Sequence, residues 1–283
     1  MNNSARYAAP ESVRDALRLL AEHGAQVVVL AGGTDVVPKI NYYELTPGII
    51  MSIGRLGLDY VQQSNGSLVI GAGASMANVS ASKLIGEKAP ALAVAAGSVA
   101  SPAIRTAATV GGNLVNASPA ADTATALLAM DAELKLASEG GERIVPLADF
   151  FVGPGETALK SNELLTEITV PVPKGKTVFA KLGRRKGMTC SVVNVAVRLE
   201  MEQDKCLDAR IALGSMAPTP IRCRKAEAII KGRKIDEGVI KECAAAAIDE
   251  TSPIDDQRAT AWYRKQAGAA VLARALKEAS GKA

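Results

Sequence analysis

The pattern of apolar positions predicts a helix and then a strand at the start of the chain. Apolar residues recur at helical spacing over 12–23, and Gly24 follows as a stop signal. A β-branched run over 26–31 then leads into Gly32 and Gly33. This order predicts an amphipathic helix, a strand and a glycine turn.

Strand-length and helix-length apolar runs alternate over the residues that follow. Further strands are predicted at 47–53, 67–70, 132–137 and 164–170. Helices are predicted at two places within 78–96, with Pro90 beginning the second of them, and at 121–130.

The segment at 171–176 is the best candidate for a domain boundary, because it combines two prolines, a glycine and lysines between apolar runs. Beyond it, strands are predicted at 192–200 and 208–213, and helices at 224–230, 237–249 and 259–279. We therefore expect domains at 1–173 and 177–283, the second a small α+β domain with helices against one face of an antiparallel sheet.

The composition is that of a soluble globular protein, with 48% hydrophobic and 22% charged residues and no apolar run of membrane-spanning length. The N-terminus resembles no export signal, so we expect a cytoplasmic location. A net charge of +4, scattered along the chain, does not indicate nucleic-acid binding. The densest basic run, at 184–186, is interpreted as a solvated or anion-facing turn.

Cysteine and histidine usage argues against several kinds of chemistry. Cys190, Cys206, Cys223 and Cys243 are too far apart for a Cys-x-x-Cys pair, the usual local framework for zinc or an iron–sulfur cluster. They are interpreted as reduced thiols. The single histidine, His23, lies at the predicted end of a helix. No metal ligand and no catalytic residue is therefore predicted.

The first chemical candidate is the glycine turn at 31–35, Ala31-Gly32-Gly33-Thr34-Asp35. Successive backbone N–H groups in such a turn can form a nest that holds a phosphate without a lysine. By itself, a Gly-Gly pair after a strand is more often an ordinary tight turn.

A second motif, Thr109-Val110-Gly111-Gly112-Asn113, repeats the combination of a hydroxyl, two glycines and a short polar side chain. Two such turns could clamp the two halves of a diphosphate such as that of FAD, with the side chains adding to the backbone donors. Spacing alone also allows two unrelated glycine turns.

The glycines at 71 and 73 suggest a dinucleotide fingerprint, but the pattern fails. Met76 stands in place of the third glycine, and the region about twenty residues further on has no acid for a ribose. We interpret 68–76 as a corner between a strand and a loop and reject a Rossmann domain.

Taken together, the motifs resemble the FAD-binding (medium) subunit family of molybdenum hydroxylases of the xanthine dehydrogenase and carbon monoxide dehydrogenase type. The resemblance rests on Ala31-Gly32-Gly33-Thr34-Asp35, Ile104-Arg105-x-x-Ala108-Thr109-Val110-Gly111-Gly112-Asn113-Leu114 and Ser118-Pro119-x-x-Asp122. It extends over nearly the whole chain, through Gly153-Pro154-Gly155, 163–171, a turn at 181–185 and the tail at 252–264.

This resemblance implies an α+β fold of the vanillyl-alcohol oxidase (PCMH) type. Two α+β subdomains, about 1–57 and 58–173, clasp an extended FAD, and a small C-terminal domain follows. It places the pyrophosphate at the two glycine motifs, and Asp122, Leu165 and Lys181 near the flavin ring or the ribityl chain. The implied cofactor-binding residues are Val29, Leu30, Ala31, Gly32, Gly33, Thr34, Asp35, Val36, Thr109, Val110, Gly111, Gly112, Asn113, Asp122, Leu165 and Lys181.

Several of these residues also fit structural roles. Asp122 suits the first turn of a helix, Leu165 a strand in the core and Lys181 a solvent-facing turn. Arg105 suits either a phosphate contact or a structural ion pair, and it is left outside the predicted site.

The family's function implies an electron-transfer subunit. The substrate is hydroxylated at a molybdenum cofactor in a large subunit, electrons cross iron–sulfur clusters in a small subunit, and the flavin subunit passes them to NAD+ or another acceptor. A dimer of heterotrimers is implied. Two alternatives stay open: a self-contained FAD-dependent oxidoreductase, and a nucleotide-binding assembly module without redox turnover.

Overall fold

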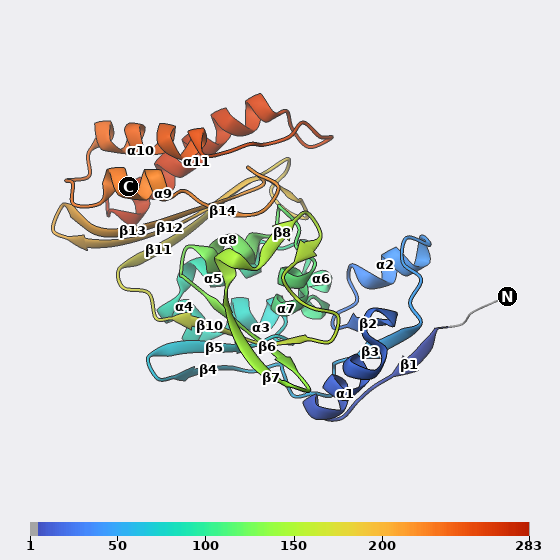
Figure 1. The fold of residues 1–283 in the computed structure, drawn as a ribbon. Helices are drawn as coiled ribbons and strands as arrows, with labels where there is room; N and C mark the ends of the chain where they lie inside the picture. Colours follow the sequence, from blue (N-terminus) through green and yellow to red (C-terminus); the bar gives the residue numbers. More distant parts are fainter. Residues whose placement is uncertain (1–4, 283) are drawn as a thin grey trace.

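The computed structural model describes residues 5–282. In that part of the chain, a small parallel sheet lies beside a larger antiparallel sheet, and a third sheet with its own helices is stacked above them (Figure 1). The helices between the second and third sheets form the centre of the molecule (Figure 1).

The first sheet has the strand order β1-β3-β2, and both strand pairs are parallel. Its strands are β1 (Arg6–Ala8), β2 (Val27–Leu30) and β3 (Ile49–Ser52), and its helices are α1 (Val13–His23), η1 (Gly24–Gln26) and α2 (Val36–Asn41). The Ser12 side chain accepts a hydrogen bond from the Asp15 N–H and caps α1, which ends at Gly24 with φ +48°. The predicted helix, strand and turn of this region are confirmed, with His23 as the last residue of α1.

The second sheet has the order β4-β5-β10-β6-β7, with antiparallel neighbours throughout. Its strands are β4 (Val61–Ser64), β5 (Ser67–Gly71), β6 (Glu133–Ser138), β7 (Gly141–Pro146) and β10 (Leu164–Pro171). Antiparallel pairing of β5 rules out a Rossmann unit at that strand. A Cβ at Gly71 would lie 2.2 Å from the Leu58 carbonyl oxygen, so glycine there allows a close backbone approach at the corner.

Helices and a short hairpin connect the strands of the second sheet. They are α3 (Met76–Ala81), α4 (Lys83–Lys88), α5 (Pro90–Gly97), α6 (Pro102–Ala107), α7 (Val110–Val115), α8 (Asp122–Leu128), η2 (Leu147–Asp149), β8 (Phe151–Gly153) and β9 (Glu156–Thr157). The predicted start of a helix at Pro90 is confirmed by α5. The predicted number of two helices within 78–96 is wrong, because α3 and α4 are separate. The side chain of Ser82 accepts from the Ile85 N–H and begins α4 as a new helix.

The third sheet is antiparallel, with the order β11-β12-β13-β14. It contains β11 (Lys176–Gly183), β12 (Ser191–Glu202), β13 (Lys205–Gly214) and β14 (Ile221–Arg222), followed by α9 (Arg224–Ile230), α10 (Glu237–Asp249) and α11 (Ala261–Ala279). The helices cover one face, as predicted (Figure 1). The stretch 181–185, predicted as a turn, begins on β11.

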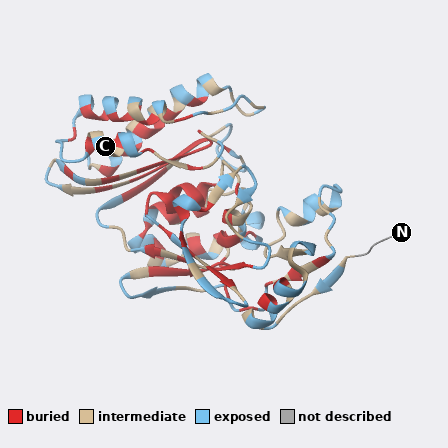
Figure 2. Ribbon diagram, viewed as in Figure 1, coloured by how far each residue is buried: buried red, intermediate tan, exposed pale blue. Residues whose placement is uncertain are grey.

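The other face of the third sheet packs against the helices of the second. Phe179, Ala196 and Ala212 stand side by side across three strands and belong to the same core as α5 and α8. Small alanine side chains let the sheet approach the helices closely. Figure 2 shows the buried residues concentrated in this central layer and on the strands beside it.

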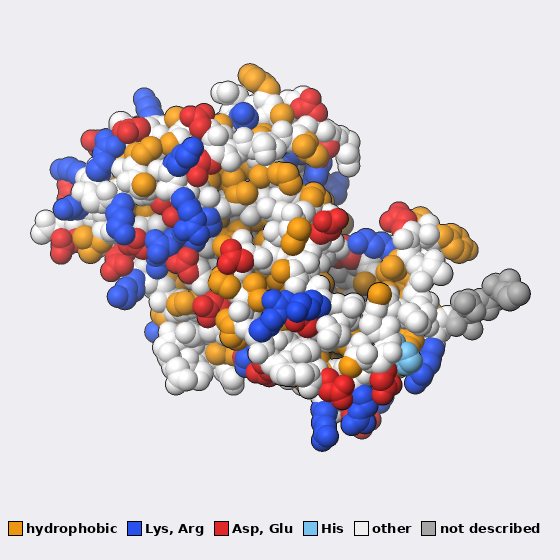
Figure 3. Space-filling model, in the orientation of Figure 1, with side chains coloured by type: hydrophobic (Ala, Val, Ile, Leu, Met, Phe, Trp, Pro, Cys, Tyr) orange, Lys and Arg blue, Asp and Glu red, His pale blue; other side chains and the backbone are white. Residues whose placement is uncertain are grey.

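Charged side chains of both signs cover the third sheet and its helices. On the face drawn in Figure 3, Lys and Arg are intermixed with Asp and Glu over this part of the molecule. Asp208, for example, lies 2.6 Å from both Arg198 and Arg210. The pair with Arg198 joins β12 to β13.

Candidate functional site

A cavity of about 790 Å³ opens between the first sheet, α7 and the loop that joins β11 to β12. This volume lies within the range of small-molecule sites. All the cofactor-binding residues implied by the resemblance line it, except Leu30 and Val110. Val110 is fully buried, and the Leu30 carbonyl accepts a hydrogen bond from the Ile53 N–H.

The first glycine motif forms a turn directly after the end of β2. A Cβ at Gly32 would lie 1.9 Å from the Ala107 carbonyl oxygen, so the backbones of these two segments touch there. Gly33 has φ +72°, a conformation that favours glycine. Within residues 5–282, no protein acceptor is hydrogen-bonded to the N–H groups of Gly32, Gly33 or Thr34. These donors are free to bind an anion at the cavity wall.

The second glycine motif is the first turn of α7, so the predicted glycine turn is wrong. Thr109 is the N-cap, and its hydroxyl accepts from the Gly112 N–H at 3.0 Å. The N–H groups of Val110 and Gly111 donate to the carbonyl oxygens of Ala74 and Ala72. The first backbone donors of this helix are therefore already engaged within the protein.

The second motif contributes side chains and an uncovered stretch of backbone to the cavity wall. Gly112 is exposed, and a Cβ there would meet the Thr109 hydroxyl at 2.9 Å with nothing else nearer than 4.0 Å. Gly111 is different, because a Cβ there would lie 2.6 Å from Ala72. Thus Gly111 is required by the packing of the protein, whereas Gly112 leaves room for a ligand.

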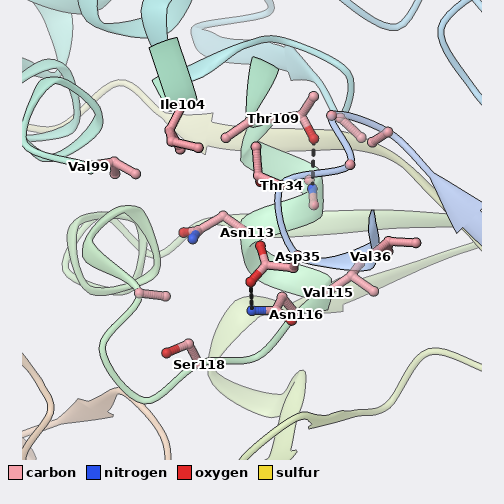
Figure 4. Close-up of a pocket in the computed structure, with 18 of the residues that line it drawn as sticks. Thr34, Asp35, Val36, Val99, Ile104, Thr109, Asn113, Val115, Asn116 and Ser118 are labelled. Carbon is pink, nitrogen blue, oxygen red and sulfur yellow. Dashed lines mark hydrogen bonds between the residues drawn. The ribbon is translucent and has the colours of Figure 1, made fainter. Parts of the chain in front are cut away.

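The two motifs are joined by Asn116, which sequence reasoning did not identify. Its amide donates to Asp35 Oδ1 at 3.2 Å and accepts from Lys39 Nζ at 3.3 Å. Figure 4 shows the two motifs facing each other, with this bond to Asp35 and the bond from Gly112 to Thr109 drawn. Asn116 lies three residues beyond Asn113, so helical spacing was the available signal.

Asp122 forms the centre of a buried polar cluster at another part of the cavity. Its carboxylate lies 2.6 Å from Lys181 Nζ and accepts from Ser191 Oγ at 2.6 Å and from Asn194 Nδ2 at 2.8 Å. The side chains of Asp122 and Lys181 are only 6% and 12% exposed. The alternative of a solvent-facing Lys181 is therefore excluded, and the cluster ties α8 to the third sheet.

Leu165 and Arg105 have roles in the protein framework. Leu165 is buried in β10 within the central core and also borders the cavity. Arg105 donates to the carbonyl oxygens of Val99 and Ala100, and within residues 5–282 it forms no ion pair. It holds the loop that carries Val99 along the cavity wall.

The loop before β12 supplies cavity residues that the sequence pattern did not reveal. Met188, Thr189 and Cys190 line the cavity, although they lie far along the chain from either glycine motif. Cys190 is the exposed cysteine, whereas Cys206, Cys223 and Cys243 are buried. Burial raises the pKa of Cys206 to about 11 and that of Cys243 to about 12, so both stay protonated thiols.

Most charged groups along the cavity are paired within the protein. Glu163 receives two short hydrogen bonds from Arg143, and these bonds hold the pKa of the Glu163 carboxyl below its usual value. Asp122 and Lys181 pair with each other. The site is thus built for binding and positioning rather than for acid–base catalysis by its own side chains.

Comparison with protein-family models accounts for both parts of the chain. Residues 3–173 match the FAD binding domain in molybdopterin dehydrogenase, and residues 178–279 match the CO dehydrogenase flavoprotein C-terminal domain. The chain belongs to the FAD-binding (medium) subunit family of the molybdenum hydroxylases. The resemblance stated from the motifs is confirmed, and the chain is an oxidoreductase subunit with an FAD-binding domain.

Two relatives within the family match over nearly their full length. The glyceraldehyde dehydrogenase medium chain of Sulfolobus acidocaldarius is 32% identical over 274 residues, 96% of this chain and 97% of that one. The carbon monoxide dehydrogenase medium chain of Afipia carboxidovorans is 31% identical over 280 residues, covering 98% and 97%.

The solved structures agree with the sequence relatives. A chain of carbon monoxide dehydrogenase from Hydrogenophaga pseudoflava matches with a TM-score of 0.95 and 31% identity over 98% of both chains. The predicted α+β FAD-binding fold of this family is confirmed. Within residues 5–282, no helix is both long and apolar enough to span a membrane.

Proposed function

We propose that FAD lies extended in this cavity, with its pyrophosphate between the two glycine motifs. The observation that carries the proposal is the set of free N–H groups at Gly32, Gly33 and Thr34, which face the cavity opposite an exposed Gly112. A diphosphate needs several donors and a close backbone approach, and this arrangement supplies both. The implied residues that line the cavity are its proposed contacts.

In this proposal the two motifs supply different groups to the pyrophosphate. The turn at 32–34 gives backbone N–H donors to phosphate oxygens. Because the N–H groups of Val110, Gly111 and Gly112 are engaged, α7 contributes the Asn113 amide and the open backbone at Gly112 instead. The Asp35 carboxylate is held against the end of α7 by the hydrogen bond that Asn116 donates to it.

Asp122, Leu165 and Lys181 are proposed to lie beside the flavin ring or the ribityl chain. A bound flavin can take up two electrons and release them one at a time, so the protein needs only to hold and tune it. The Asp122 cluster can do so because its bonds to Lys181, Ser191 and Asn194 fix the third sheet over the cavity.

We propose that the chain works in a complex, taking electrons from iron–sulfur clusters of a small subunit and passing them to NAD+ or another acceptor. The molybdenum cofactor belongs to a large subunit in this proposal, and the assembly is a dimer of heterotrimers. Two findings support it: the relatives are medium chains or subunits, and within 5–282 no three His, Cys, Asp or Glu residues are grouped to hold a metal. The cytoplasmic location stays a prediction.

The exposed aromatic residues support the proposal that this chain binds partner chains. Four of the five tyrosines and the single tryptophan are at least 46% exposed: Tyr7, Tyr42, Tyr43, Tyr263 and Trp262. Tyrosine and tryptophan are enriched at protein–protein interfaces. The proposed domains, 1–173 and 177–283 with subdomains 1–57 and 58–173, place these residues on both domains.

Purification of the tagged full chain from its own host tests the proposed complex. We expect one larger and one smaller partner chain to copurify with it. Molybdenum and iron should be present in a fixed ratio to FAD. A chain that purifies alone with FAD, and that turns over an organic substrate by itself, would overturn the electron-transfer proposal in favour of a self-contained oxidoreductase.

A further inference from the structure

The side chain of Asn113 is held by a residue that does not line the cavity. Thr123 is fully buried in α8, and its hydroxyl donates to Asn113 Oδ1 at 2.6 Å. No other hydrogen bond of this hydroxyl is found within residues 5–282. The bond joins α8 to α7, across the base of the second glycine motif.

In the observed orientation of the Asn113 amide, its oxygen end receives the Thr123 bond and its NH₂ end is turned away from Thr123. An amide has an acceptor oxygen and a donor NH₂ group, and rotation by 180° exchanges them. With Oδ1 engaged by Thr123, no hydrogen bond joins Nδ2 to the part of the chain that the structure describes, and Asn113 lines the cavity. The NH₂ group is thus the end available to an anion, and the reversed amide would present an oxygen that repels it.

We propose that Thr123 is a positioning residue that fixes the Asn113 amide with its NH₂ group towards the cofactor pyrophosphate. The inference rests on the proposed FAD site and assigns a role to a residue outside it. Thr123 suits this role because its branched side chain has few rotamers and α8 is buried along its whole length.

Helix α8 is also anchored immediately before Thr123. Asp122 is held by Lys181, Ser191 and Asn194 from the third sheet. The first turn of α8 therefore connects two parts of the site: Asp122 fixes the third sheet, and Thr123 orients a phosphate donor. A rigid support of this kind is what precise placement of a binding group requires.

The chain contains a matched control on the same helix. Thr125 is also fully buried in α8, but its hydroxyl bonds to its own helix, at the Ala121 carbonyl oxygen, 3.4 Å away. Thr125→Val therefore removes a buried hydroxyl from α8 without touching Asn113. Thr123→Val removes the bond to Asn113 at nearly the same side-chain shape.

Titration of the purified, FAD-stripped full chain with FAD, followed by flavin fluorescence, tests the role of Thr123. We expect Thr123→Val to raise the Kd for FAD about tenfold, as loss of an oriented hydrogen bond to a charged group predicts. Thr123→Ser, which keeps the hydroxyl, should restore the wild-type Kd, and Thr125→Val should stay within about twofold of it.

A double-mutant cycle with Asn113→Ala separates orientation from general packing. If Thr123 acts through the amide, Thr123→Val should have no further effect on the Kd once Asn113 is alanine. A wild-type Kd in Thr123→Val, or an equal loss in Thr125→Val, would overturn the role of Thr123. A wild-type chain that takes up no FAD would instead contradict the proposed function.

Discussion

The glycine motif that follows β2 and the motif that begins α7 share a hydroxyl, two glycines and a short polar side chain, yet their backbones are used differently. At 32–34 the N–H groups have no protein acceptor. At 110–112 they bond to Ala74, Ala72 and Thr109. The first motif can donate from its backbone, whereas the second must contribute side chains and space.

The glycines of the two motifs differ in the same way. Gly32 and Gly111 are needed because the backbone of another segment lies against them, and Gly33 because of its positive φ. Only at Gly112 does the missing side chain open towards the cavity. Of two adjacent glycines in a motif, one can thus be required for folding and the other for binding. Substitution of each glycine can test this difference.

The largest effect is expected where a glycine touches backbone. Gly32→Ala and Gly111→Ala place a Cβ 1.9 Å from Ala107 and 2.6 Å from Ala72. We expect each to destabilise the protein by about 4 kcal/mol, lowering the Tm by roughly 8 °C or more. Thermal unfolding of the FAD-free protein measures this. The control is Gly86→Ala, where a Cβ meets nothing within 4 Å; equal Tm values for all three would contradict the packing account.

The next effect separates binding from folding at the second motif. Gly112→Val should still fold, although its Cβ displaces the Thr109 hydroxyl that caps α7. It should lose FAD affinity by about 100-fold, or about 2.7 kcal/mol, because the rest of the new side chain occupies the space proposed for a phosphate. FAD titration and thermal unfolding are measured together. Gly86→Val controls for a branched residue in a short helix. Full FAD occupancy in folded Gly112→Val would show that the clamp is misplaced.

A smaller effect is expected at the first motif from backbone strain. Gly33→Ala forces an alanine to φ +72° beside Val37 and should cost about 1–2 kcal/mol of stability. Gly57→Ala imposes similar strain at φ +67°, with no neighbour within 4 Å, away from the cavity. Denaturant unfolding should show a similar loss in both, while FAD titration should show weaker binding for Gly33→Ala alone. Equal FAD affinities would argue against a phosphate nest.

The smallest effects concern the two threonines. Thr109→Ala removes the N-cap of α7 and should cost about 1 kcal/mol of apoprotein stability. Thr34→Ala removes a hydroxyl with no hydrogen bond to the described protein, so apoprotein stability should change by less than about 0.5 kcal/mol. Chemical denaturation of both FAD-free variants checks the difference. A larger loss for Thr34→Ala would show that the first turn is held by its side chain.

The apolar pattern predicted the central strands and most helices because those elements are buried. β5, β6, β10, β12 and β13 lie inside their sheets and carry the apolar runs that were identified. β4 and β7 form the edges of the second sheet, and they were missed because exposed positions there are polar, as in Gln62 and Gln63 of β4. Edge strands carry little period-two signal.

Of the site, only the residues that belong to sequence motifs were predicted. The two glycine motifs were identified from their own residues, and Asp122 was supplied by the resemblance. Asn116 was missed although its helical spacing from Asn113 offered a signal. The loop at 188–190 and Thr123 depend on tertiary contacts between distant segments, for which the sequence contains no spacing signal. Likewise, whether Thr109 begins a turn or caps a helix is decided by the carbonyl groups of Ala72 and Ala74, which receive its following N–H groups.

The most direct test of the central claim is an absorbance spectrum of the purified full chain, with the released cofactor identified by mass. We predict a flavin spectrum and one FAD per chain, held by the free donors at 32–34. A colourless protein that also fails to take up added FAD would contradict the claim and leave a nucleotide-binding assembly module as the better interpretation.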